Sequence, residues 1–153
     1  MTDNRRIEMT EESDRPRIIR AIKKCLFNAD EFFEKAMDSL DEIGRSSVGT
    51  GITPLIGGYA LPNAKTHYRE AIIAIDSGEK ALAPLVKRFR DGRVNVSHFK
   101  SDEAITVLED LAGVDFNMLI SNLLQNRGRE SSWYRLKEVR GRISEALNLV
   151  AES

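Results

Sequence analysis

Apolar residues recur at alternating steps of three and four in this chain, and this spacing constrains the fold more than any other feature. In the first of four such stretches they fall at Ile19, Ile22, Leu26, Ala29, Phe33, Ala36, Leu40 and Ile43. Because side chains three and four apart share one face of an α-helix, the pattern predicts a helix with one buried face. That face is widened by Ile18, Cys25 and Phe32, as is typical of a helix in a globular bundle. The predicted helix begins near Pro16 and ends at Gly44.

Three further stretches repeat this spacing. The second follows a cap at Asn63 and has Tyr68, Ala71, Ile75, Gly78, Leu82, Leu85 and Phe89. The third follows a cap at Ser101, is interrupted at Gly113 and resumes after Asp115, with Ile105, Leu108, Ala112, Phe116, Leu119, Ile120 and Leu123. The fourth follows Gly128 and has Leu136, Val139, Ile143, Ala146 and Val150. Because glycine and proline disfavour a helix interior, Gly78 and Pro84 predict a kink or break in the second helix.

Four such helices joined by mostly short connections predict an all-α fold, an antiparallel up-down four-helix bundle whose second and third helices are kinked or broken. A chain of 153 residues, 41% of them hydrophobic, can bury one core without disulfides. Residues 1–14 are polar, and we expect a flexible tail there, followed by a single domain over residues 15–153. Within that domain, residues 46–63 are uncharged and rich in glycine and proline, which predicts an apolar loop.

The cysteine content and hydropathy indicate the cellular compartment. The chain's only cysteine, Cys25, excludes an internal disulfide and argues against cysteine-rich zinc ligation. Cys25 lies beside the first apolar face, where a small buried filler is expected. No run approaches the ~20 apolar residues of a membrane span, and the first residues lack the apolar centre of a signal peptide. We therefore expect a cytoplasmic protein that does not enter a membrane.

Metal and cofactor chemistry finds little support. His67 precedes Glu70 by three residues, which reverses the Glu-x-x-His order of metal-binding bundles. Histidine phosphotransfer modules carry lysine and glycine at the third and fourth positions after their histidine, where this chain has Glu70 and Ala71. The glycines at 49, 51, 57 and 58 follow no predicted strand and precede no phosphate-binding lysine. We expect no metal and no small-molecule cofactor.

One short motif supports a catalytic alternative. Arg93-Val-Asn-Val-Ser-His98 resembles the arginine, four residues, histidine motif of the HEPN ribonucleases, which are also small helical bundles. The resemblance implies a dimer acting on RNA in a toxin or phage-defence system. In that interpretation His98 is the general acid or base on the ribose 2′-hydroxyl, and Arg93 stabilises phosphate charge. Val94 departs from the polar residue that commonly follows the family's arginine.

Cations are concentrated in two segments that an antiparallel bundle brings together. Residues 15–24 hold five basic residues and no acid, and residues 87–100 hold five more against one acid. We call these ten residues the basic pole: Arg15, Arg17, Arg20, Lys23, Lys24, Lys87, Arg88, Arg90, Arg93 and Lys100. Such a surface can bind phosphates or an acidic protein. The alternative is neutralisation by solvent or by the acids of the tail.

Two further segments are candidates for contacts. The apolar loop either covers the end of the bundle or presents Ile52, Leu55, Ile56 and Tyr59 to another subunit. A second basic run, from Arg127 to Arg142, includes Trp133, which we expect to pack beneath that loop. Because no catalytic constellation stands out, the sequence predicts a non-catalytic binding protein, an adaptor, regulator or subunit of a larger assembly. Its expected partner is a protein, a nucleic acid or a second copy of itself.

Overall fold

The computed structural model describes residues 2–49, 60–94, 99 and 101–151, and the side chains of residues 15–44, 65–94, 99 and 101–151. Within these residues the regular secondary structure is entirely helical. The helices are α1 (Thr2–Gly49), α2 (Ala60–Arg90), α3 (Asp102–Ala112), α4 (Phe116–Leu124) and α5 (Arg129–Ala151). None of the helices described is long and apolar enough to cross a membrane.

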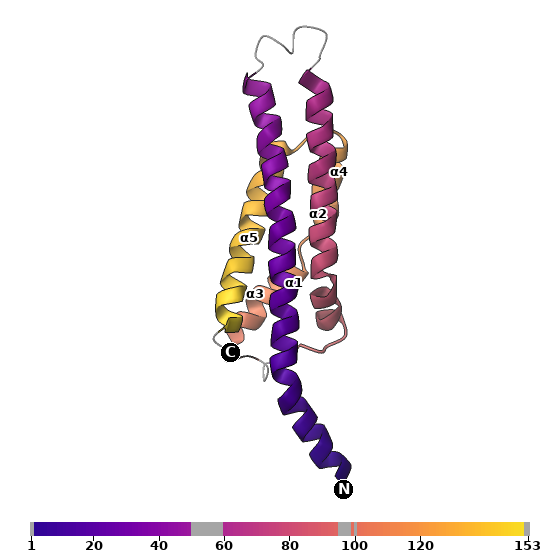
Figure 1. Cartoon of the computed structure of the whole chain (residues 1–153), viewed down its shortest axis with the longest axis vertical. Coiled ribbons are helices and arrows are strands. Elements are labelled where there is room, and N and C mark those ends of the chain that lie inside the picture. The colour runs from indigo at the N-terminus through magenta and orange to yellow at the C-terminus, as the bar shows by residue number, and fades with distance from the viewer. Residues whose placement is uncertain (1, 50–59, 95–98, 100, 152–153) are drawn as a thin grey trace.

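The helices pack in the arrangement shown in Figure 1, with α1 at its centre. α2 lies beside α1, α5 lies along its other flank, α4 packs on α2, and α3 packs on α5. α1 and α2 run in opposite directions. Phe33 of α1 lies against Gly78, whereas Cys25, earlier on α1, lies close enough to Arg88, later on α2, to interact with its charge. The predicted all-α fold of packed helices is therefore confirmed.

The core is formed by the apolar faces that the three-four spacing predicted. On α1 the residues from Ile22 to Ile43 that fall on this spacing are at most 3% exposed. Phe33 is completely buried and stacks on Phe116 of α4, with ring centroids 5.0 Å apart and an interplanar angle of 16°. This stack joins the first helix to the fourth through the centre of the molecule.

The third predicted helix is divided into α3 and α4, as Gly113 and Asp115 indicated. The Ser101 hydroxyl accepts a hydrogen bond from the Ala104 amide at 3.4 Å and caps α3. The Asp115 carboxylate accepts one from the Asn117 amide at 3.1 Å and caps α4. Each cap satisfies an amide that the first turn of a helix leaves without a partner.

The second helix is not broken, which corrects one of the predicted alternatives. α2 runs without interruption from Ala60 to Arg90 and contains both Gly78 and Pro84. A Cβ atom on Gly78 would stand 2.3 Å from Cε1 of Phe33, so the glycine allows the ring to approach the helix backbone. Tertiary packing thus explains a residue whose local preference predicted a kink or break.

The ends of α1 and α2 also differ from the predicted boundaries. α1 begins at Thr2 rather than near Pro16, and it continues past Gly44 to Gly49. The segment before Pro16 contains arginine, glutamate and methionine, which favour a helix, so its polar composition did not exclude regular structure. The loop predicted at 46–63 is shortened from both sides by α1 and α2. The division into a tail and a domain stays a prediction.

Candidate functional site

The part of the basic pole that lies on α1 is largely exposed. Arg17, Arg20 and Lys24 are exposed, whereas Arg15 and Lys23 are partly buried. The Arg20 guanidinium donates to the Pro16 carbonyl at 3.4 Å. Figure 1 shows that the N-terminal end of α1 extends beyond the last turn of α2.

The part on α2 occupies its last turn, which contains Lys87, Arg88 and Arg90. Cations at this end of a helix complement the partial negative charge of its terminal carbonyl groups. Burial raises the pKa of the Cys25 thiol, while the positive charges of Arg88 and Lys24 act in the opposite direction. The positive charges of Lys24 on α1 and Arg88 on α2 thus both act on the Cys25 thiol, so the two cationic segments lie close together there.

Several cations of the basic pole lack the ion pairs that some cations elsewhere in the described residues make. On α5, Arg135 pairs with Glu138 at 2.7 Å. Across the bundle, Arg140 donates to both carboxylate oxygens of Asp30, at 2.9 and 3.3 Å, and the first of these bonds raises the pKa of Arg140. By contrast, some pole cations make no ion pair with an acid in the part of the chain that the structure describes: Arg20, Lys23, Lys24, Lys87, Arg88 and Arg90.

The structure describes only one residue of the HEPN-like pair. Arg93 is exposed, and its amide donates to the Arg88 carbonyl at 2.8 Å just after α2. His98 and the pole residue Lys100 lie outside the described residues. A ribonuclease site at Arg93 and His98 therefore stays a prediction.

The predicted contact residues of the apolar loop are not placed either. Ile52, Leu55, Ile56 and Tyr59 all lie outside the described residues, so their role as a cover or an interface stays a prediction.

The other candidates for chemistry have ordinary surroundings. His67 is partly buried, and its Nδ1 lies 3.3 Å from a Glu70 carboxylate oxygen, one turn further along α2. Among the described side chains, no group of three or more histidine, cysteine, aspartate or glutamate residues is arranged to hold a metal ion.

Trp133 is partly buried against the core at the start of α5. The rings of Trp133 and Tyr134 make an edge-to-face contact with their centres 5.1 Å apart, and the Lys137 ammonium lies 5.5 Å from the centre of the Trp133 ring. Its indole Nε1 is buried without a hydrogen-bond partner among the described residues. The predicted packing beneath the apolar loop concerns residues outside the described part.

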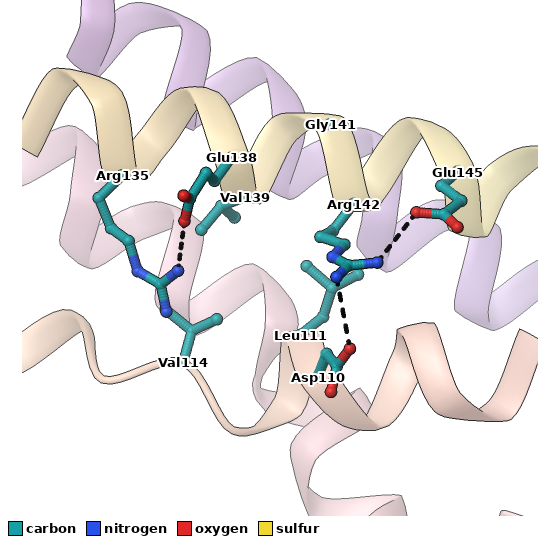
Figure 2. A pocket seen from close by; sticks show the side chains of 9 residues that line it. All are labelled: Asp110, Leu111, Val114, Arg135, Glu138, Val139, Gly141, Arg142 and Glu145. Atoms are coloured by element: carbon teal, nitrogen blue, oxygen red, sulfur yellow. Dashed lines mark hydrogen bonds and ion pairs between the residues drawn. The ribbon is translucent and has the colours of Figure 1, made fainter.

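One concave surface was missed by the sequence reasoning. A groove of about 540 Å³ lies between α5 and the α3–α4 connection (Figure 2). Its lining includes Arg135, Glu138, Arg142 and Glu145, spaced three, four and three residues apart along α5. This regular alternation of sign was readable in the sequence, but the segment was interpreted as a basic run because only Glu130 and Glu138 accompany its six cations and Glu145 lies beyond its end.

Comparison with known proteins yields no assignment: no protein-family model, no curated protein and no solved structure matches this chain.

Proposed function

We propose that this chain is a non-catalytic helical-bundle binding protein, an adaptor, regulator or subunit of a larger assembly. Its basic pole contacts an acidic protein or a nucleic acid. The proposal includes the up-down order of the helices, because opposite directions bring the cations of α1 toward the end of α2.

The observation that carries the proposal is the concentration, on neighbouring parts of α1 and α2, of cations that have no acidic partner among the described residues. Arg140 and Lys80 each have an acidic partner within 3 Å, whereas exposed pole cations such as Lys24, Lys87 and Arg90 have none among the described residues. Unpaired charges of one sign sum to a positive potential, which attracts polyanions and increases the rate of association.

The helix dipole explains only half of this arrangement. The cations in the last turn of α2 complement the dipole of that helix. Because α1 begins at Thr2, residues 15–24 lie well inside it, where the effect of the dipole has faded. The helix dipole therefore does not explain the cations of α1, which supports a role for them in binding.

Filter binding with RNA and duplex DNA across a salt series tests the proposal, with polyglutamate as the acidic-protein probe. We expect binding at low salt that falls as salt rises, because cations that bind phosphates displace condensed counterions. Replacing Arg20, Lys24 and Arg90 together with alanine should weaken binding. On duplex DNA it should also reduce the salt slope by about 0.9 for each phosphate that the variant no longer neutralises.

The matched control removes three exposed cations from elsewhere on α2, namely Lys65, Arg69 and Lys80. This variant has the same net charge as the first, so equal weakening in both would show a general charge effect and contradict a localised pole. Absence of salt-dependent binding to all three probes would also contradict the proposal.

A further inference from the structure

The groove beside α5 has an apolar floor and a charged rim. Leu111, Val114 and Val139 contribute the apolar side chains. The rim consists of Asp110, Arg135, Glu138, Arg142 and Glu145. About half of the surface of Arg135, Arg142 and Glu145 is exposed, and that of Glu138 is 68% exposed. The groove is therefore accessible along the helix.

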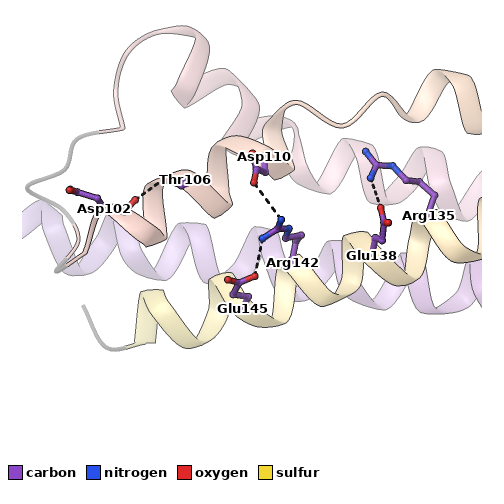
Figure 3. Close-up of polar contacts among 7 residues, drawn as sticks. All are labelled: Asp102, Thr106, Asp110, Arg135, Glu138, Arg142 and Glu145. Carbon is purple, nitrogen blue, oxygen red and sulfur yellow. Dashed lines mark hydrogen bonds and ion pairs between the residues drawn. The ribbon is translucent and has the colours of Figure 1, made fainter.

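Charges of opposite sign alternate along this rim. Arg135 pairs with Glu138 at 2.7 Å, and Arg142 pairs with Glu145 at 3.2 Å and lies 4.0 Å from Asp110 of α3 (Figure 3). Positions 135, 138, 142 and 145 follow the spacing of a helix–helix seam, because steps of three and four keep side chains on one face. A seam with this charge pattern is complementary to its own reversed copy.

Gly141 provides a second, independent observation. It lies inside α5, where glycine costs about 1 kcal/mol relative to alanine. A Cβ atom there would meet nothing within 4 Å, whereas one on Gly78 would collide with Phe33. Contacts within the described chain thus explain Gly78 but not Gly141. The space beside Gly141 is open to a helix from outside.

We propose that this groove binds α5 of a second copy of the chain, with the two helices antiparallel around a two-fold axis that crosses the groove at the level of position 140 along α5. In that arrangement position 135 lies opposite position 145, and position 138 lies opposite position 142. Arg135 then faces the partner's Glu145, and Glu138 faces the partner's Arg142. The two-fold symmetry repeats both pairs, and Gly141 lets the helix backbones approach near the axis.

The sign of the charges selects the antiparallel orientation. A parallel pair of α5 helices would set each arginine and glutamate against its own copy, and opposed like charges disfavour such contacts. The interface uses α5 and none of the residues of the basic pole. Dimerisation and binding by the basic pole can therefore fail separately.

Sedimentation velocity up to about 0.2 mM protein tests the dimer. We expect wild type to self-associate at low salt and to dissociate as salt screens the interface charges. Gly141→Leu should stay monomeric, keep its helical circular dichroism and melt no lower than wild type, because the chain leaves room for the new side chain and leucine favours a helix more than glycine does. A wild type that is monomeric throughout, or a Gly141→Leu variant that dimerises as wild type does, would overturn the proposal.

The control for the added leucine is Ser121→Leu, at an exposed position on α4. This variant should dimerise as wild type does, because α4 lies outside the interface. If Ser121→Leu abolished dimerisation and Gly141→Leu did not, the interface would lie elsewhere and the proposal would be wrong.

Charge reversal tests the register. Glu138→Lys and Arg142→Glu each create two like-charge pairs in a homodimer, and each should weaken dimerisation about tenfold. Mixing the two variants should restore it, because a dimer with one copy of each again pairs opposite charges at both places. If the mixture associated no more tightly than the single variants, the antiparallel register would be refuted.

Discussion

The substitution Gly78→Ala tests how the two longest helices fit together. The new Cβ would stand 2.3, 2.7 and 2.8 Å from three carbons of the Phe33 ring. Carbon atoms in favourable contact are about 3.5–4.0 Å apart, so ring and helix must separate by roughly 1 Å. The Phe33 ring cannot shift without displacing its neighbours, because it is fully buried and stacks on Phe116.

Two opposing effects set the size of the change. Alanine gains about 1 kcal/mol over glycine in a helix interior. Overpacking a core costs about 1–3 kcal/mol, and the immobile ring places this site at the upper end. We expect Gly78→Ala to lower the free energy of unfolding by about 1–2 kcal/mol, which corresponds to a melting temperature lower by roughly 2–8 °C.

Urea denaturation followed by circular dichroism at low protein concentration measures this difference. Gly141→Ala is the matched control and should gain up to about 1 kcal/mol, since its Cβ meets nothing within 4 Å. In a Phe33→Leu background Gly78→Ala should cost at least about 1 kcal/mol less than in wild type. If Gly78→Ala stabilised the wild-type protein as much as Gly141→Ala does, the packing argument would be refuted.

Three further predictions concern polar and reactive groups. Asp30→Ala should lower the free energy of unfolding by about 1 kcal/mol, because it removes the two hydrogen bonds from Arg140. Arg135→Ala removes only an exposed ion pair and should change it by less than about 0.5 kcal/mol. Equal effects of the two substitutions in urea denaturation would contradict this. Ser132→Ala should raise the melting temperature, because its hydroxyl is buried without a hydrogen-bond partner among the described residues, and a lower value would refute that reasoning. Since burial raises the pKa of Cys25, its reaction with a disulfide reagent should accelerate with a midpoint above pH 9.0. The stability supplied by the neutral thiol is complete below that pH and declines as the pH rises above it. A midpoint at or below 9.0 would contradict both statements.

Features set by local physics were predictable from the sequence. The spacing of Ile22, Leu26 and Phe33 predicted which face of α1 is buried, because helical periodicity fixes which side chains share a face. Ser101 and Asp115 were identifiable as caps, because a cap bonds to an amide two or three residues away. Such interactions need no knowledge of the rest of the chain.

Features set by distant residues were not predictable in this way. Gly78 indicated a kink or break when only its own helix was considered, and its contact with Phe33 becomes visible only in the folded structure. Asp30 and Arg140 are 110 residues apart, and nothing in either segment names the other as its partner. The sequence therefore located the cations of the chain, but the neutralisation of Arg140 by Asp30 depends on the packing of α1 against α5.

The two proposed contacts use charge in different ways, and this difference allows both to exist on one molecule. On α5 each arginine of the groove has a glutamate three residues away, so the fields cancel within a short distance and only a matched surface is attracted. At the basic pole like charges add, so the field reaches further and tolerates many geometries, which suits a polyanion. An antiparallel dimer through α5 would also carry the two basic poles to opposite ends, because the two-fold axis reverses the direction of every helix. Repulsion between the poles would then be small, and each would remain available to its own partner.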